Sequence, residues 1–143
     1  LNRRHKKRPI MNRLTNIFTP IVQRQLEGLA LLLSSVILYG HLQFSWIVFA
    51  TYYFLPDLPI LLYFKGPKVG GIFYNMIHIL LLPLLIGLFG VMWNYPVAQQ
   101  AALIWISHIA FDRAIGWGLK YEDSFCNTDL GVRTLPFSWS ILE

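Results

Sequence analysis

The chain has 143 residues, of which 55% are hydrophobic and only 13% are charged. Water-soluble domains carry about 25% charged residues, so this composition indicates a membrane protein and excludes a disordered, collagen-like or coiled-coil chain. The formal net charge is +5, but so apolar a chain has too little polar surface for a nucleic-acid-binding protein. The single cysteine, Cys126, excludes an internal disulfide framework and a multi-cysteine metal site.

Four apolar runs have about the 20 residues that a helix needs to cross a bilayer. They extend from about Leu26 to Leu42, Phe44 to Phe64, Val69 to Phe89 and Val97 to Leu119. Short connections make sequential helices antiparallel neighbours. We therefore predict an all-α fold: an integral membrane four-helix up-and-down bundle over residues 26–119, with a basic arm over 1–25 and a tail over 120–143.

The 12 lysines and arginines predict the orientation of the bundle, because positive residues favour the cytoplasmic side of a membrane. They lie in the N-terminal arm, in the second connection and around the end of the fourth run: Arg3, Arg4, Lys6, Lys7, Arg8, Arg13, Arg24, Lys65, Lys68, Arg113, Lys120 and Arg133. Both termini are therefore expected in the cytoplasm. The basic arm is either a topology signal or a contact for anionic lipids. We expect no signal peptide, because the first apolar run is long and lacks a small-residue cleavage site.

Ionisable side chains inside the apolar runs indicate a functional site, because Asp or Arg at the centre of a span costs about 2.5 to 3.5 kcal/mol. They are Glu27, Asp57, His78, His108, Asp112 and Arg113, accompanied by Tyr74 and Asn75. At a rise of about 1.5 Å per residue, Asp57, His78 and His108 are expected roughly 12 to 18 Å from the cytoplasmic flanks of their helices. The sequence thus predicts a polar site near the membrane midplane, open to the cytoplasmic side.

Helical spacing and prolines shape this expected site. His108 and Asp112 are four residues apart, as are Tyr74 and His78, so each pair shares one helix face. Pro56 and Pro59 flank Asp57 and should disrupt the helix there, which is tolerated only where the backbone lines a cavity or is buried in protein. Pro83 should kink the third span.

The charges of the polar residues leave three possibilities for the chemistry of the site. Glu27, Asp57 and Asp112 carry three negative charges against the one permanent cation, Arg113. The difference can be met by a divalent metal with neutral histidines, by two protonated histidines, or by protons on the carboxylates. Imidazole and carboxylate ligands suit zinc, manganese or iron. The same groups could instead hydrogen-bond across helices only to hold the bundle together.

Several motifs resemble a family of small bacterial membrane proteins known as a domain of unknown function. The resemblance covers roughly Arg24 to Asp129 and rests on Pro56-Asp57-Leu58, Tyr74-Asn75-x-x-His78 and Phe111-Asp112-Arg113, with Arg24-x-x-Glu27-Gly28 before them and glycines after them. In that family Ser commonly follows the Asp-Leu pair, where this chain has Pro59. The resemblance implies a bacterial inner-membrane protein and the same polar residues, but no activity.

We weigh three functions. In a metal-assisted hydrolase of a lipid or other amphipathic substrate, Asp57, His78, His108 and Asp112 would bind the ion, and Arg113 would hold an anionic headgroup. Glu27, Tyr74 and Asn75 would support the site or the substrate. In a proton- or ion-transport element the same groups would exchange protons, which requires a homo-oligomer. In an accessory or cofactor-binding subunit of a larger membrane complex, the cluster would serve helix packing or hold a cofactor. The functions differ in whether the cluster binds metal, changes protonation or does neither.

Overall fold

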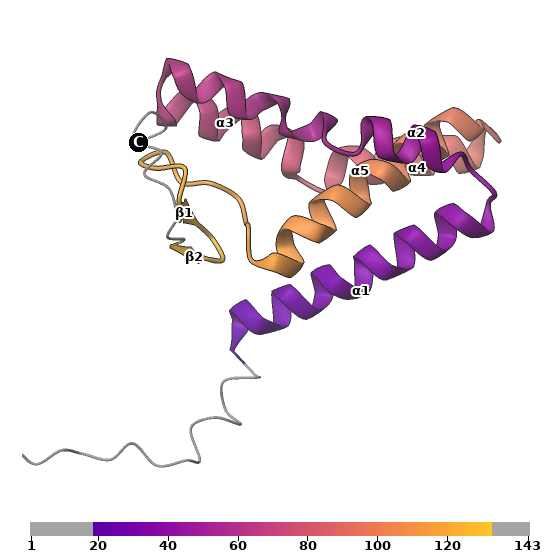
Figure 1. Ribbon diagram of the computed structural model, residues 1–143, viewed down its shortest axis with the longest axis horizontal. Helices are drawn as coiled ribbons and strands as arrows, with labels where there is room; N and C mark the ends of the chain where they lie inside the picture. Colours follow the sequence, from indigo (N-terminus) through magenta and orange to yellow (C-terminus); the bar gives the residue numbers. More distant parts are fainter. Residues whose placement is uncertain (1–18, 133–143) are drawn as a thin grey trace, which may run out of the picture.

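The structure is a computed structural model that describes residues 19–132, so most of the predicted basic arm and the end of the tail lie outside the described residues. The described chain is helical, apart from one short β-hairpin (Figure 1). Its elements are α1 (Pro20–His41), α2 (Trp46–Tyr52), the 3₁₀ helix η3 (Leu55–Lys65), α3 (Pro67–His78), α4 (Leu81–Met92), α5 (Pro96–Ile115), β1 (Asn127–Thr128) and β2 (Gly131–Val132). The predicted helical class is therefore confirmed.

Helix α1 begins earlier than the predicted start at Leu26. The Thr19 hydroxyl accepts a hydrogen bond from the Val22 N–H at 3.4 Å, and Pro20 occupies the first turn, where its missing N–H costs nothing. Gln23 and Arg24 ended the apolar run in the sequence, but both are exposed on the first turns of the helix. A membrane helix can thus extend past its apolar run where its end carries polar residues.

The second and third predicted spans are both broken in the middle. In the second, α2 ends at Tyr52 and η3 begins at Leu55; Pro56 has no N–H to pair with the Tyr52 carbonyl. In the third, α3 ends at His78 and α4 begins at Leu81. Pro83 cannot pair with the carbonyl four residues earlier, so the break falls before the proline. Both disruptions were predicted from these prolines.

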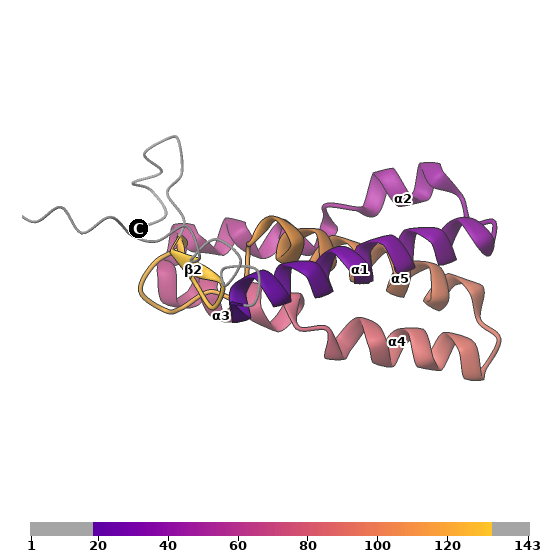
Figure 2. The ribbon, with the colours of Figure 1, turned by 90° about the horizontal axis from the view of Figure 1, so that it is seen from below.

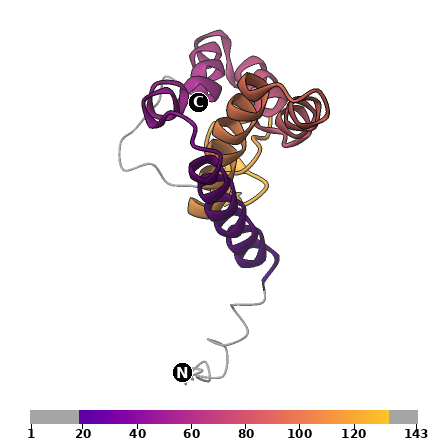
Figure 3. The ribbon, with the colours of Figure 1, turned by 90° about the vertical axis from the view of Figure 1, so that its right-hand side faces the viewer.

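Helix α5 is the central helix of the fold. It lies beside α1 along most of its length and also packs against α4 (Figures 1 and 2). Seen from the end of the molecule, it lies between α1 and the remaining helices (Figure 3). Nine of its residues are buried, more than in any other helix of the described chain. Because α5 lies between the other helices, its polar residues can lie in the interior of the bundle.

Within the described residues, three segments are long and apolar enough to cross a membrane: Pro20–His41, Trp46–Lys65 and Pro67–Met92. The prediction of four apolar spans is therefore confirmed for three of them. Helix α5 falls short because Gln99, Gln100 and its ionisable residues lower its hydropathy. The three apolar segments turn large side chains outward, with Leu33, Ile37 and Leu85 at 54%, 70% and 53% exposure. Such outward apolar faces fit a lipid environment.

The described residues that follow α5, 116–132, fold back onto the bundle. The β-hairpin pairs Asn127 with Val132 and Thr128 with Gly131. The Asp129 carboxylate accepts hydrogen bonds from the Leu119 N–H at 2.8 Å and from the Arg24 guanidinium at 3.0 Å. The hairpin is thereby tied to the start of α1, and both lie at the same end of the molecule (Figure 1).

Candidate metal centre

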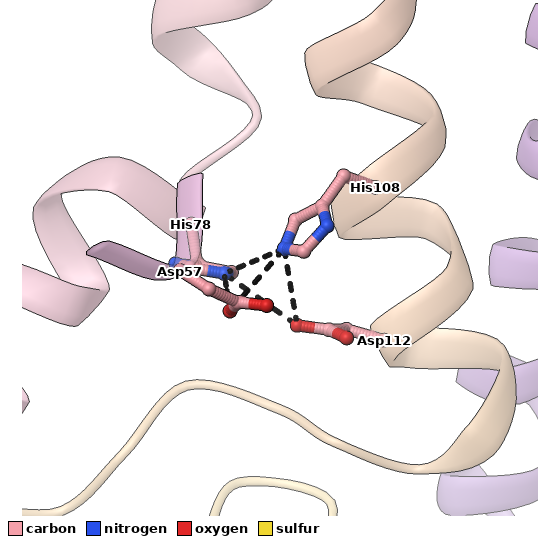
Figure 4. Close-up of side chains that lie close together, drawn as sticks. All are labelled: Asp57, His78, His108 and Asp112. Carbon is pink, nitrogen blue, oxygen red and sulfur yellow. Dashed lines mark hydrogen bonds and ion pairs between the residues drawn. The ribbon is translucent and has the colours of Figure 1, made fainter. Parts of the chain in front are cut away.

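Four side chains from three helical spans meet in the interior of the bundle (Figure 4). Asp57 comes from the start of η3, His78 from the last residue of α3, and His108 and Asp112 from successive turns of α5. His78 and His108 are 3% and 1% exposed. The structure thus brings together the four residues that the sequence analysis singled out as metal ligands.

The four possible ligand atoms lie close to one another. The Nε2 atoms of the two histidines are 3.3 Å apart. Asp57 Oδ1 lies 3.5 Å from His78 Nε2 and 3.4 Å from His108 Nε2, while Asp112 Oδ2 lies 3.5 and 3.8 Å from the same two atoms. All four atoms are within 4.8 Å of one another.

Five of the six separations among these atoms are close to those around a tetrahedral zinc ion, and the sixth, between the two carboxylate oxygens, is at most 4.8 Å. Zinc lies about 2.0 to 2.2 Å from nitrogen and oxygen ligands, so the edges of the tetrahedron measure about 3.3 to 3.6 Å. Four of the five measured separations fall in or beside this range, and the fifth is 3.8 Å. The mixture of imidazole and carboxylate also suits zinc, manganese or iron better than calcium or magnesium, which prefer oxygen alone. The cluster could therefore hold a first-row transition metal.

The helix breaks place two of the four ligands. Because η3 starts just before Asp57 and α3 ends at His78, both side chains leave the backbone where the regular helix stops. The break also frees the Ile77 carbonyl, which accepts a hydrogen bond from the Trp105 indole N–H at 2.8 Å. Broken backbone at this depth is tolerated because protein groups satisfy it, and here the satisfying group comes from α5.

Tyr74 orients two of the ligands at once. Its hydroxyl donates a hydrogen bond to Asp112 Oδ2 at 2.9 Å, and its ring stacks on the His78 imidazole with centroids 3.6 Å apart. Its carbonyl oxygen accepts from His78 Nδ1 at 3.0 Å. A carbonyl only accepts, so Nδ1 carries the proton, and the Nε2 lone pair of a neutral His78 faces the cluster. This arrangement is typical of a metal-ligating histidine.

The remaining predicted site residues lie outside the four-residue cluster. Glu27 is exposed on α1. Arg113 faces the charges of Asp129, Arg24 and Glu27. The Asn75 side chain forms its hydrogen bonds with the backbone of Lys120. The predicted roles of Glu27 and Arg113 in catalysis or substrate binding stay predictions.

A pocket of about 340 Å³ opens beside the cluster. Asp57, His108 and Asp112 form part of its wall, and the rest is mostly apolar and aromatic: Phe54, Ile60, Tyr74, Phe111, Ile115, Trp117, Lys120 and Phe125. The Asp57 side chain is 32% exposed, against 15% for that of Asp112. The cluster is thus accessible from one side, where a water molecule could join an ion as a further ligand.

Lys120 is a component of this pocket that the sequence analysis counted only as a topology signal. The residue is 4% exposed and follows the C-terminal end of α5. Burial lowers the pKa of its amine to about 8. A lysine just past an apolar run ordinarily extends into the headgroups, so the sequence alone carries no signal that this one is enclosed.

The sequence model of a family described as "Domain of unknown function (DUF4260)" matches residues 21–132. No curated protein and no solved structure matches the chain. The matched residues include all four members of the cluster, the pocket wall and the hairpin. The family match therefore covers the whole site.

Proposed function

The chain belongs to the DUF4260 family, and for this member we propose a membrane-embedded, zinc-dependent hydrolase that acts on an amphipathic substrate. The observation that carries the proposal is the set of four ligand atoms, with their separations of 3.3 to 3.8 Å. A divalent ion held there would take water from the pocket as a fifth ligand, and would activate that water and polarise the bond to be broken. Manganese or iron could take the place of zinc with the same ligands.

The position of the cluster supports an amphipathic substrate. Asp57, His108 and Asp112 face a pocket whose other walls are largely aromatic and aliphatic. A substrate with an apolar chain and a polar head would satisfy both parts of this pocket. A purely polar substrate would leave the apolar walls in contact with water.

We further propose that the chain crosses a bacterial inner membrane four times in an up-and-down arrangement, with both termini in the cytoplasm. Helix α5, with 20 residues, is about 30 Å long and would be the fourth span, shielded from lipid by its neighbours. Arg24 lies in the first turns of α1, Lys65 ends η3 and Lys68 lies in the first turn of α3; these helix ends and the hairpin lie at one end of the fold (Figure 1). This distribution supports a cytoplasmic location for that end.

Metal analysis of the detergent-purified protein tests the proposal. Wild type, His78→Ala and His108→Ala would be compared after mild chelation and dialysis against zinc. His41→Ala is the matched control, because His41 is exposed at the far end of α1. We expect about one zinc ion per chain in wild type and His41→Ala, and none in the other two variants.

Folded wild type that binds no zinc, manganese or iron would overturn the metal-dependent function. The cluster would then serve proton exchange or helix packing, as in a transport element or an accessory subunit. Metal binding without hydrolysis of any lipid or ester substrate would instead favour a cofactor-binding subunit. The metal content therefore comes before any search for substrates.

A further inference from the structure

The Lys120 amine is enclosed by aromatic rings. Its Nζ atom lies 4.0 Å from the ring centroid of Trp117, 4.2 Å from that of Phe125 and 4.9 Å from that of Tyr74. Within the described residues, Nζ makes no hydrogen bond and no ion pair. A buried ammonium group has three donors, and cation–π contacts satisfy none of them as a hydrogen-bond acceptor would. The amine therefore has no hydrogen-bonded or ion-paired anionic group within the described part of the chain.

The fold fixes the backbone of Lys120 closely. Its N–H donates to Asn75 Oδ1 at 2.7 Å, and its carbonyl accepts from Asn75 Nδ2 at 2.8 Å. One side chain of α3 thus satisfies both backbone groups of Lys120, which also forms a β-bridge with Thr128. A solvent-facing lysine needs no such contacts to its backbone. Here they hold the Lys120 backbone, and with it the start of the side chain, at the pocket wall.

Lys120 and the four-residue cluster share one pocket. Lys120 lines it together with Asp57, His108 and Asp112. Tyr74 connects the two, because its ring lies under the amine while its hydroxyl bonds to Asp112. A divalent ion would neutralise the two carboxylates, so the positive charge of Lys120 would then have no counter-charge among the groups that line the pocket.

We propose that Lys120 binds the phosphate group of an amphipathic phosphate ester in this pocket. This inference rests on the proposed function and adds the class of substrate to it. A phosphate carries several acceptor oxygens, so one group can contact a metal and an ammonium group from different directions. The aromatic wall receives the apolar chain. The amine is available for this role at neutral pH, because it keeps its proton up to about pH 8.

A competing role for Lys120 is that of counter-ion to Asp57 and Asp112. That role predicts stronger zinc binding when the lysine is removed, because a positive charge beside the ion would be gone. It predicts that phosphate binding changes only as a result of the stronger zinc binding. The two roles can therefore be separated by measuring zinc and phosphate binding on the same variants.

The test titrates dodecyl phosphate into detergent-purified full-length protein, followed by ³¹P NMR, with and without zinc. Wild type, Lys120→Arg and Lys120→Met are compared. Lys65→Met is the matched control, because Lys65 is an exposed lysine of the same end of the fold that does not line the pocket. Inorganic phosphate is titrated in parallel, and the zinc affinity of every variant is measured by competition with a chelator.

We expect Lys120→Met to weaken dodecyl phosphate binding by about tenfold to a hundredfold, as for a lost charged hydrogen bond. The zinc affinity should stay that of wild type, Lys120→Arg should retain most of the affinity for dodecyl phosphate, and Lys65→Met should retain all of it. Unchanged dodecyl phosphate binding in Lys120→Met would overturn the proposal. Equal affinity for inorganic phosphate would overturn its amphipathic part and point to a free phosphate.

The failure of the proposed function would be recognised separately. A wild-type protein without zinc that still binds dodecyl phosphate through Lys120 would overturn the metal site alone. A zinc-loaded protein that binds dodecyl phosphate equally well as wild type and as Lys120→Met would overturn this inference alone.

Discussion

The Nε2 atoms of His78 and His108 face each other at 3.3 Å, although the two residues are 30 positions apart in the chain. The Nδ1 proton of His78 is donated to the Tyr74 carbonyl, so the Nε2 of neutral His78 presents a lone pair. Two lone pairs at this distance repel each other. Either an N–H of His108 donated to His78 or a cation between the rings removes that repulsion, and the negative charges of the two carboxylates beside them attract a cation to this point.

The hydroxyl of Tyr74 should raise the metal affinity of the cluster. In Tyr74→Phe the hydrogen bond to Asp112 is lost, while the aromatic ring that stacks on His78 remains. Loss of such an outer contact to a ligand typically costs about tenfold to a hundredfold in metal affinity. We expect this weakening in a zinc titration against a competing chelator. Tyr52→Phe, a change at an exposed tyrosine, is the control; equal affinities in the two variants would contradict the role of Tyr74.

How much of this site the sequence predicts depends on the depth of each residue in its apolar run. Asp57, His78, His108 and Asp112 lie inside the runs, where an ionisable group is costly, and this signal identified all four. Glu27 was grouped with them by the same rule but is exposed on α1. It lies near the end of its helix, where a carboxylate costs little. Composition alone does not distinguish these two situations.

Lys120 and the hairpin illustrate what the sequence cannot predict. The sequence assigned residues 120–143 to a tail with no predicted structure, and the packing of its described part depends on long-range contacts such as Asn75 with Lys120. These contacts have no periodicity. The helix breaks, in contrast, follow from a local property, since Pro56 and Pro83 remove specific backbone donors. Local chemistry was therefore predicted better than tertiary packing.

Gly28 should be essential for the contact between α1 and α5. A Cβ atom at this position would lie 2.8 Å from the Ala114 nitrogen and 2.8 Å from the Arg113 Cβ. Small residues permit such close helix contacts in membranes, and overpacking typically costs about 1 to 3 kcal/mol. We expect Gly28→Ala to lower the thermal unfolding temperature in detergent.

Gly71→Ala is the matched control for Gly28→Ala. Gly71 is also a buried helical glycine, but a Cβ there would meet its nearest neighbour, the Tyr121 carbonyl, at an ordinary 3.4 Å. Because alanine favours a helix over glycine by about 0.8 to 1 kcal/mol, this variant should be as stable as wild type or more stable. Equal destabilisation of the two variants would contradict the close contact at Gly28.

The buried amine of Lys120 should make stability depend on pH. Its pKa is lowered from 10.5 to about 8, chiefly by burial and against the attraction of Asp112. Between these two values the unfolded chain binds more protons than the folded one, so stability rises as the pH increases from about 8 to 10.5. Lys120→Met lacks this contribution. In thermal unfolding, the difference between wild type and Lys120→Met should therefore shift in favour of wild type from pH 7 to pH 10; a constant difference would contradict the lowered pKa.

Asn75 should act on phosphate binding through Lys120. Asn75→Ala removes both hydrogen bonds to the Lys120 backbone, whereas Asn75→Asp keeps the acceptor for the N–H and loses the donor to the carbonyl. The alanine variant should weaken dodecyl phosphate binding nearly as much as Lys120→Met, and the aspartate variant less. Zinc content should not change, because the Asn75 side chain forms its hydrogen bonds with the backbone of Lys120.

A loss of zinc together with phosphate binding would instead mean that Asn75 supports the packing of α3 as a whole, since His78 lies on the same helix. Measuring both ligands on each variant separates the two explanations. If Asn75→Ala binds dodecyl phosphate as wild type does, the two hydrogen bonds between Asn75 and the Lys120 backbone are not needed to hold the amine in place. The three aromatic rings around the amine would then suffice to hold it at the pocket wall.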